Sequence, residues 1–379
     1  MRAVFLVVLA AGCGFKVGGT VEPDSGGHDA PPGDVAFDAP ADQAIDDAPR
    51  SWWDPAWAHR RRITIDSGML AGDVTDFPVL VRIPAASLAG NIQSDCDDLR
   101  FIEADDVTPV AMELDTCGAG SGADTTVWIK RTLVQAASPH RLWLYYSAGG
   151  NDVSNGAAVF GSSGAGYESV HHMGVTADVT GNGHGLSAQG GPTVTAGQIS
   201  QASNFDGVDD YYSLSNGDSD FDFTTTMSAS AWVKVGAFTD QWQAILAKGD
   251  NAWRMHRGDT TNGVGFGTTS SSVHDDLNGS TNVNDGAWHH VAIVMDGAKK
   301  YLYVDGIEDE QRAYTLTLQA NSRGVRIGMN QDASPNRFWE GQIDEVRISA
   351  VARSAAWISA EQLTGVSTTF VTIGDDEPF

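Results

Sequence analysis

The sequence predicts an all-β protein made of two tandem β-sandwich domains. Short runs in which every second residue is apolar recur along the chain, and this period of two is typical of strands with one buried face. Segments rich in Gly, Asn and Asp separate the runs, as turns between antiparallel strands do. A Gly- and Ser-rich stretch at residues 150–166 divides them into two groups. We therefore expect domains at residues 51–149 and 167–368, joined by this linker and followed by a tail at residues 369–379.

The chain begins with a segment typical of an export signal. Arg2 precedes an unbroken apolar stretch from Ala3 to Ala11. As a helix this stretch is about 14 Å long, roughly half the thickness of the bilayer hydrocarbon. It is too short to span a membrane, so we expect a signal peptide over residues 1–12.

The residues at the end of this segment, Leu9-Ala10-Ala11-Gly12-Cys13, resemble the lipobox of bacterial lipoproteins. Ala10 departs from the pattern, because many lipoboxes have Leu at that position. The resemblance implies that Cys13 is lipidated and that the acyl chains anchor the protein in a membrane. Gly14, in place of the Asp that retains enteric lipoproteins, favours the outer membrane or the cell surface. An ordinary secretory signal with an incidental cysteine is the alternative.

The segment that follows, residues 13–50, is expected to be a disordered acidic tether. From Val21 to Pro49 it has eight acidic residues, five prolines and no Lys or Arg. Such a composition cannot build a hydrophobic core. Charge repulsion and polyproline geometry should keep it extended, so that it holds the folded domains away from the membrane.

The charge balance excludes one class of partner. Asp and Glu total 49 against 23 Lys and Arg, which gives a formal net charge of −26. A chain of this charge repels nucleic acid. We therefore expect carbohydrate or extracellular protein as the ligand, and no nucleic acid.

Cys96 and Cys117 are expected to form a disulfide, because both lie in the exported part of the chain and Cys13 is the only other cysteine. The two are 21 residues apart. Closing a loop of this length stabilises a protein by roughly 3 kcal/mol in the chain-entropy model.

Each domain contains a series of alternating runs. In the first domain they include Ile63 to Ile65, Phe77 to Ile83, Leu99 to Phe101, Met112 to Leu114, Val127 to Ile129 and Leu142 to Tyr146. In the second domain we expect strands at residues 210–214, 227–235, 244–248, 264–268, 289–296, 300–304, 325–328 and 342–348. Only residues 354–363 are typical of a helix, with Ser354 as its N-cap.

Four motifs carry a family resemblance in the second domain. They are Phe205-Asp206-Gly207-Val208-Asp209-Asp210-Tyr211, Trp288-His289-His290-Val291-Ala292, Tyr301-Leu302-Tyr303-Val304-Asp305-Gly306 and Gly341-Gln342-Ile343-Asp344-Glu345-Val346-Arg347-Ile348. Together they resemble the laminin G-like, concanavalin A-like lectin/glucanase superfamily, which implies a jelly roll. The first domain resembles a bacterial domain of unknown function (number 2341) through Trp53-Asp54-Pro55-Ala56-Trp57, Phe77-Pro78-Val79-Leu80-Val81, Asp98-Leu99-Arg100-Phe101, Val127-Trp128-Ile129-Lys130 and Leu144-Tyr145-Tyr146.

The sequence gives little support for catalysis, and we expect no catalytic residues. Glucanases of this superfamily carry Glu-x-Asp-x-x-Glu, which neither residues 308–310 nor Glu340, Asp344 and Glu345 reproduce. His289 and His290 are adjacent on a predicted strand, so they point to opposite faces and cannot share an ion. A glycan hydrolase remains an alternative to a binding module, as does a protein adhesion module that binds no sugar.

Binding requires exposed aromatic side chains, because sugar rings stack on flat rings. The candidates are Trp242, Trp253 and Trp339, which lie near polar segments rich in Gly or Asn. A position in the core is the alternative for each of them.

The resemblance also implies a structural calcium ion, since many laminin G-like domains hold Ca²⁺ with Asp side chains. Oxygen donors suit this cation. The candidates are Asp178, Asn182, Asp206 and Asp344, which converge if the first and last strands are neighbours. A role in shaping turns is the alternative for Asp178, Asn182 and Asp206.

Overall fold

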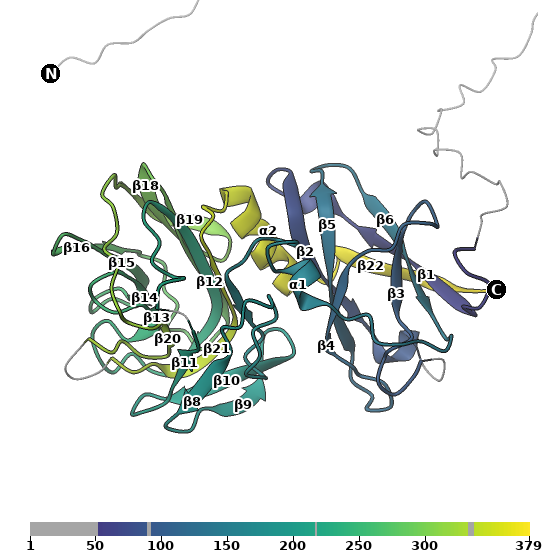
Figure 1. Cartoon of the computed structure of the whole chain (residues 1–379), viewed down its shortest axis with the longest axis horizontal. Helices are drawn as coiled ribbons and strands as arrows, with labels where there is room; N and C mark the ends of the chain where they lie inside the picture. The colour runs from purple at the N-terminus through teal and green to yellow at the C-terminus, as the bar shows by residue number, and fades with distance from the viewer. Residues whose placement is uncertain (1–51, 89–91, 217, 333–336) are drawn as a thin grey trace, which may run out of the picture. The chain divides into compact units, whose positions relative to one another are not determined.

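The computed structural model describes residues 52–88, 92–216, 218–332 and 337–379. Nearly all of its regular structure is β-strand, arranged in antiparallel sheets that form two sandwiches (Figure 1). This confirms the all-β prediction. The predicted signal peptide, the lipidated Cys13 and the tether lie outside the described residues. Among the helices that are described, none combines the length and apolar character needed to cross a membrane.

The first sandwich consists of one sheet with strand order β22-β1-β6-β3 and a second with order β2-β5-β4. Apolar residues alternate into the space between the two sheets, as in Phe77, Val79 and Val81 of β2, which are fully buried. The strands are β1 (His59–Ile65), β2 (Val74–Ile83), β3 (Arg100–Glu103), β4 (Met112–Thr116), β5 (Thr125–Val134), β6 (His140–Tyr146) and β22 (Val371–Pro378).

The end of the chain belongs to the first sandwich. We expected a tail at residues 369–379, but β22 pairs antiparallel with β1 at the edge of the sheet. The expectation was wrong because only the start of β22 is apolar, and its remaining residues bind by charge. Asp376 lies 2.8 Å from the ring of His59, and Glu377 lies 2.9 Å from Nε of Arg60. The first sandwich is therefore built from two distant parts of the chain.

The second sandwich consists of an eight-stranded and a seven-stranded sheet. The larger has the order β19-β18-β17-β12-β21-β10-β9, with β7 also paired to β21, and the smaller has the order β16-β15-β14-β13-β20-β11-β8. The strands of the larger sheet are β7 (Ser169–His171), β9 (Thr193–Ala196), β10 (Gln201–Asp206), β12 (Thr226–Val235), β17 (His289–Asp296), β18 (Lys299–Val304), β19 (Ile307–Ala313) and β21 (Glu340–Ser349). Those of the smaller sheet are β8 (Leu186–Gln189), β11 (Tyr211–Leu214), β13 (Ala244–Ala247), β14 (Trp253–Arg257), β15 (Val264–Ser270), β16 (Val273–Asn278) and β20 (Arg326–Ile327).

The turn between β18 and β19 shows how the sequence closes a hairpin. Asp305 and Gly306 both have a positive φ, 51° and 76°. This is the geometry of a two-residue turn whose twist matches that of the flanking strands, and Asp and Gly tolerate it best. The sequence pair Asp-Gly therefore ends one strand and starts the next.

Helix α2 (Ala355–Val366) joins the cores of the two sandwiches. Ser354 caps it by accepting a hydrogen bond from the amide of Trp357, as predicted. The ring of Trp357 packs at 5.1 Å from that of Phe77 in β2. The amide of Leu80 in the same strand donates to the hydroxyl of Thr364 at 3.0 Å. Helix α2 is thus packed between the two sandwiches (Figure 1).

The segment expected as a linker, residues 150–166, is also part of this core. It forms the short helix α1 (Gly156–Val159), capped by the side chain of Asn155. Val159 and Phe160 are fully buried. The ring of Phe160 packs at 5.6 Å from that of Trp128 in β5. The Gly and Ser content of this segment therefore reflects tight packing and not an open connection.

Candidate binding site

The outer face of the seven-stranded sheet carries the candidate binding site. Neighbouring residues of a strand point to opposite faces of a sheet. Ile327 of β20 and Tyr212 of β11 face each other in the ladder and are buried in the core. Arg326 and Tyr211, which precede them in sequence, therefore point away from the core.

Half-buried aromatic and basic side chains alternate on this face. The guanidinium carbon of Arg337 lies 4.8 Å from the centre of the Trp242 ring. That of Arg326 lies 5.7 Å from the centre of the Tyr211 ring. The ring of Phe338, the residue after Arg337 in sequence, packs at 6.3 Å from the ring of Tyr211. These five residues are half-buried, and we call them the Trp242 face.

The backbone of Trp242 is in the left-handed region, with φ 54°. A bulky residue is rare there because its Cβ crowds the following carbonyl. Such conformations cost about 1–3 kcal/mol and are concentrated at functional sites. The buried amide of Gln243 donates to the carbonyl of Phe338 at 3.1 Å and ties this turn to the next segment of the face.

A carboxylate holds Arg337 in place. Oδ1 of Asp250 accepts a hydrogen bond from Nη1 of Arg337 at 3.2 Å and another from the amide of Asn330 at 2.7 Å. Nε of Arg254 lies 3.6 Å from the same oxygen. Asp250 therefore connects the loop that carries Arg337 to strand β14.

Arg254 extends this network toward the edge of the sheet. Its Nη2 donates to Oδ1 of Asp276 in β16 at 2.7 Å. To reach it, the side chain crosses Gly267 of β15, where a Cβ would lie 2.6 Å from the guanidinium carbon. Burial raises the pKa of Asp276, but the contact with His256 and the charge of Arg254 outweigh burial and hold the pKa below its ordinary value. Asp276 is therefore a stable anion.

Two of the three tryptophans predicted to bind ligand are part of the core. Trp253 and Trp339 are both fully buried between the sheets. The indole N–H of Trp253 donates to the carbonyl of Phe221 at 3.0 Å. A ring without exposed surface cannot stack on a sugar, so the prediction was wrong for both. Trp242 is the candidate that reaches the surface.

The loop predicted to hold calcium is organised by its own hydrogen bonds. One oxygen of Asp178 accepts from the amide and the hydroxyl of Thr180, and the other accepts from the amide of His184. The amide of Asn182 donates to the carbonyl of Glu168 at 2.9 Å. These contacts are those of a turn in which the side chains fix the backbone.

The other two predicted calcium ligands do not meet. Asp206 pairs with Glu340, four residues before Asp344 in β21, which is about 13 Å along a strand. One ion cannot bridge that distance. Asp344 is fully buried, and burial raises its pKa well above the ordinary value, whereas Asp206 lies beside Asp209 and Asp210. The four candidates form no common site, and calcium binding stays a prediction.

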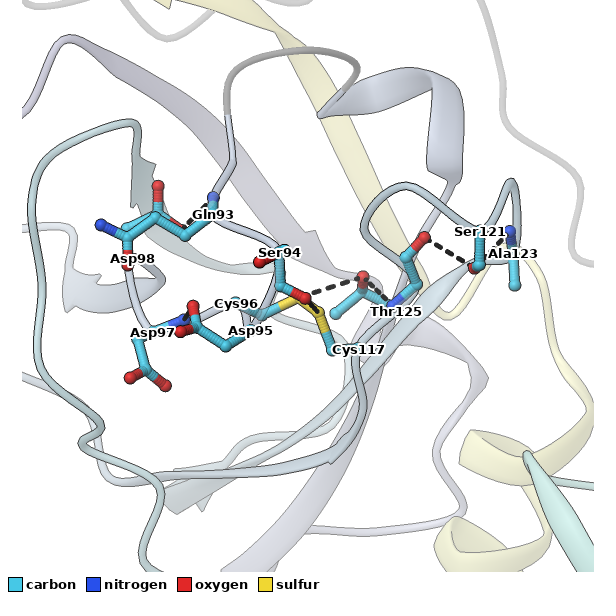
Figure 2. The surroundings of a disulfide bond; sticks show 11 residues. Gln93, Ser94, Asp95, Cys96, Asp97, Asp98, Cys117, Ser121, Ala123 and Thr125 are labelled. Carbon is cyan, nitrogen blue, oxygen red and sulfur yellow. Dashed lines mark hydrogen bonds between the residues drawn. A yellow bond between two sulfur atoms is a disulfide. The ribbon is translucent and has the colours of Figure 1, made fainter.

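The predicted disulfide between Cys96 and Cys117 is confirmed (Figure 2). Their Cα atoms are 5.8 Å apart. The bond ties the segment before β3 to the connection between β4 and β5, where the hydroxyl of Thr125 accepts from the amide of Gly118 at 3.0 Å. It therefore stabilises one end of the first sandwich, far in sequence from the Trp242 face.

The histidine pair and the acidic runs have structural roles. Nδ1 of His289 lies 2.8 Å from Asp305, whereas His290 packs its ring against Trp232 on the other side of the strand. This confirms that the two histidines do not converge. Residues 308–310 lie on the edge strand β19, and Glu345 is buried.

The sequence patterns identified only Trp242 among the five residues of the Trp242 face. Tyr211 lies within one of the family motifs, and Arg326 lies in the strand predicted at residues 325–328, next to the apolar Ile327, so alternation places both on the outside. No local sequence pattern identifies Arg337 and Phe338 as site residues, because they contact Trp242 and Tyr211, which are distant in sequence.

Three solved structures illustrate what the chain is similar to. The binding domain of Paraclostridial Mosquitocidal Protein 1 aligns with 52% of this chain and 52% of its own, at 15% identity and a TM-score of 0.45. Domain 4 of AbnA, a GH43 extracellular arabinanase from Geobacillus stearothermophilus in complex with arabinotriose, aligns with 51% of this chain and 97% of its own, at 20% identity and 0.43. The botulinum neurotoxin serotype C1 binding domain aligns over 53% and 52%, at 13% identity and 0.43. The chain thus spans about half the length of the first and third of these proteins.

A family model covers most of the second sandwich. No curated protein matches the chain. Residues 206–359 match the model described as the concanavalin A-like lectin/glucanases superfamily, and this range includes all five residues of the Trp242 face. Together with the two packed antiparallel sheets, the match confirms the resemblance stated for the second domain. The second sandwich is a concanavalin A-like jelly roll.

Proposed function

We propose that the second sandwich is a non-catalytic carbohydrate-binding module whose ligand lies on the Trp242 face. The observation that carries the proposal is the backbone of Trp242, which holds a large, half-buried ring at the surface at a conformational cost. The core does not require this geometry, because the ring is not fully buried. Ligand binding at the surface explains why the protein keeps this strained turn.

The chemistry of the face suits a sugar. Flat rings such as those of Trp242, Phe338 and Tyr211 match the apolar faces of pyranose and furanose rings. Guanidinium groups donate several hydrogen bonds in fixed directions to hydroxyl and carboxylate oxygens. The stacked arrangement of Arg337 on Trp242 and Arg326 on Tyr211 fixes the side chains before a ligand arrives, which lowers the entropic cost of binding.

The carboxylates beside the face favour binding over hydrolysis. A glycosidase needs one carboxyl with a raised pKa to protonate the leaving group. Asp276 has a lowered pKa, and both Asp276 and Asp250 interact with Arg254. Asp250 also receives hydrogen bonds from Arg337 and Asn330. These contacts hold the face together, and the lowered pKa makes Asp276 unsuited to donating a proton.

We further propose that the chain displays this module outside the cell through a lipid on Cys13. The short apolar stretch and the small residues before Cys13 support this placement, and the acidic linker supports a tether. Mass spectrometry of the mature N-terminus tests it. Acylated Cys13 is the expected result, and an unmodified Cys13 or cleavage well beyond it contradicts the anchor.

A glycan array probed with the chain from residue 14 onward tests the binding function. We expect selective glycan binding that Trp242→Ala abolishes. Tyr301→Ala is the matched control, because Tyr301 is a half-buried aromatic residue on β18 of the other sheet. Product release from a polysaccharide points to a hydrolase instead. Binding of protein partners with no glycan bound contradicts the proposal and favours an adhesion module.

A further inference from the structure

Arg326 lies near the middle of the seven-stranded sheet. In β20 it faces Ser213 of β11 on one side and Ala247 of β13 on the other. Both neighbours have short side chains, so the guanidinium group extends beyond them, and the next residue in this row is Arg254 of β14, opposite Ala247. Its carbon lies 5.7 Å from the centre of the Tyr211 ring.

Arg326 has no carboxylate partner among the described residues, and its Nε is buried without a hydrogen bond. Residues 333–336, which precede Arg337 in sequence, are Ala-Ser-Pro-Asn and carry no acidic group. A buried donor without an acceptor is costly, because it has lost its water. In a chain of net charge −26, a half-buried arginine without an acidic partner can accept one from a ligand.

The neighbouring arginines differ from it. Arg254 lies 2.7 Å from Asp276, Arg323 lies 2.8 Å from Asp332, and Arg337 lies 3.2 Å from Asp250. Each of these side chains is neutralised by the protein itself. Of these four arginines, Arg326 is the one without an acidic partner among the described residues. Its guanidinium group is therefore available to a hydrogen-bond acceptor on a ligand.

We propose that the Trp242 face binds an acidic saccharide and that Arg326 takes its carboxylate, an inference that rests on the proposed function and names its substrate class. A guanidinium group matches a carboxylate with two parallel hydrogen bonds. The ring of Tyr211 beneath it orients the planar group. The sugar ring then lies over Phe338 and Tyr211, with its carboxylate directed to Arg326.

The tether offers a second source of carboxylates. Residues 21–49 carry eight acidic side chains on the same chain. If they occupied Arg326, they would compete with an acidic saccharide. A variant with all eight replaced by Asn or Gln separates the two sources without changing the length of the chain.

The test measures affinity for acidic polysaccharides and for their carboxyl-reduced forms, by isothermal titration calorimetry with the chain from residue 14 onward. The panel contains polygalacturonate, alginate and hyaluronan, each with its neutral counterpart. We expect at least one acidic form to bind ten-fold or more tightly than its reduced form. Arg326→Gln should bring this ratio close to one. Arg312→Gln removes the same charge from an exposed arginine on β19 and should leave the ratio unchanged.

Several outcomes overturn the proposal. One is an Arg326→Gln variant that melts like the wild type and keeps the ratio. Another is equal affinity for acidic and reduced forms; if Trp242→Ala abolishes that neutral binding, the carbohydrate-binding function stands and only the acidic ligand is wrong. A third is a preference for the acidic form that appears only in the variant with the neutralised tether. In that case the carboxylates of the tether occupy Arg326 in the wild-type protein. Absence of binding to every glycan in the panel and on the array overturns both proposals.

Discussion

Nδ1 of His172 lies 2.6 Å from Oε1 of Glu345, and both side chains are buried. The other ring nitrogen lies 3.4 Å from Oε2 of Glu113, which belongs to β4 of the first sandwich. Arg347 adds a second cation, with its Nη2 2.9 Å from Glu345. His172 therefore connects charges of both sandwiches in a place that water does not reach.

This cluster predicts that stability falls as the pH rises from neutral. Burial lowers the pKa of His172, but the charges of Glu345 and Glu113 outweigh burial and raise it well above the ordinary value of 6.5. A raised pKa stabilises the folded state fully below the unfolded pKa, and this contribution is lost as the pH rises through the folded value. We expect the free energy of unfolding to decrease above about pH 6.5, measured by urea denaturation followed by Trp fluorescence.

His172→Gln is the control for this pH dependence. Gln keeps a hydrogen-bond donor but does not titrate, so the variant should lose the part of the slope that comes from His172. It should also be less stable below about pH 6.5, by about 3–5 kcal/mol, because buried Glu113 loses the cation of His172 and buried Glu345 keeps only that of Arg347. His289 also has a raised pKa, caused chiefly by its hydrogen bond with Asp305, but both proteins share it. Identical slopes for the two proteins contradict the assignment.

We expect the substitutions Trp253→Ala and Trp242→Ala to differ in their effect on stability. Trp253→Ala leaves a large cavity in the second core and should cost about 3–5 kcal/mol. Trp242→Ala removes a half-buried ring that lies outside the core and leaves the backbone strain unchanged, because Ala keeps the Cβ, so we expect a change of about 1 kcal/mol or less. Urea denaturation of the two variants measures both values. Equal destabilisation means that Trp242 is a core residue and weakens the proposed face.

The disulfide should contribute measurably to the first sandwich. We expect the Cys96→Ser, Cys117→Ser double variant to lose roughly 3 kcal/mol, because the unfolded chain regains the freedom of a loop closed over 21 residues. The wild-type protein unfolded with and without reductant gives an independent value. Unchanged midpoints in both experiments show that the crosslink does not stabilise the fold.

Strand β22 predicts that the C-terminus is needed for the first sandwich. A chain that ends at Phe370 loses the whole ladder with β1 and exposes that strand as a new edge, which favours aggregation. We expect a lower melting temperature and larger species in size-exclusion chromatography. Asp376→Asn with Glu377→Gln is the control, because each of these ion pairs has a carboxylate that is still partly exposed to water and contributes about 1 kcal/mol or less. A truncated chain that behaves like this control contradicts the role of the ladder.

Alternation and turn chemistry were enough to predict the fold class. Residues of β2 and β12 alternate or run as continuous apolar stretches, and the pair Asp305 and Gly306 marks a hairpin. The prediction failed where charge or packing replaced these signals. β22 pairs its acidic residues with the basic residues of β1, and the Gly-rich residues 150–166 pack into the core.

The site was less predictable because it depends on long-range neighbours. Trp253 and Trp339 have polar neighbours in sequence, yet both rings point into the core. The sequence does not distinguish Arg326 from the other arginines, because its buried Nε and its lack of an acidic partner in the described part of the chain are seen only in three dimensions. Arg337 reaches Trp242 only because their two loops meet at one end of β13.

Hydroxyl-radical footprinting with mass spectrometry tests the central claim most directly, because it reports which side chains a bound glycan covers. The chain from residue 14 onward is oxidised with and without a glycan selected on the array. We predict protection of Trp242, Phe338 and Tyr211, and no change at Tyr301 on the opposite sheet. Protection at Tyr301 or in the first sandwich, with the Trp242 face still oxidised at its free rate, would contradict the account.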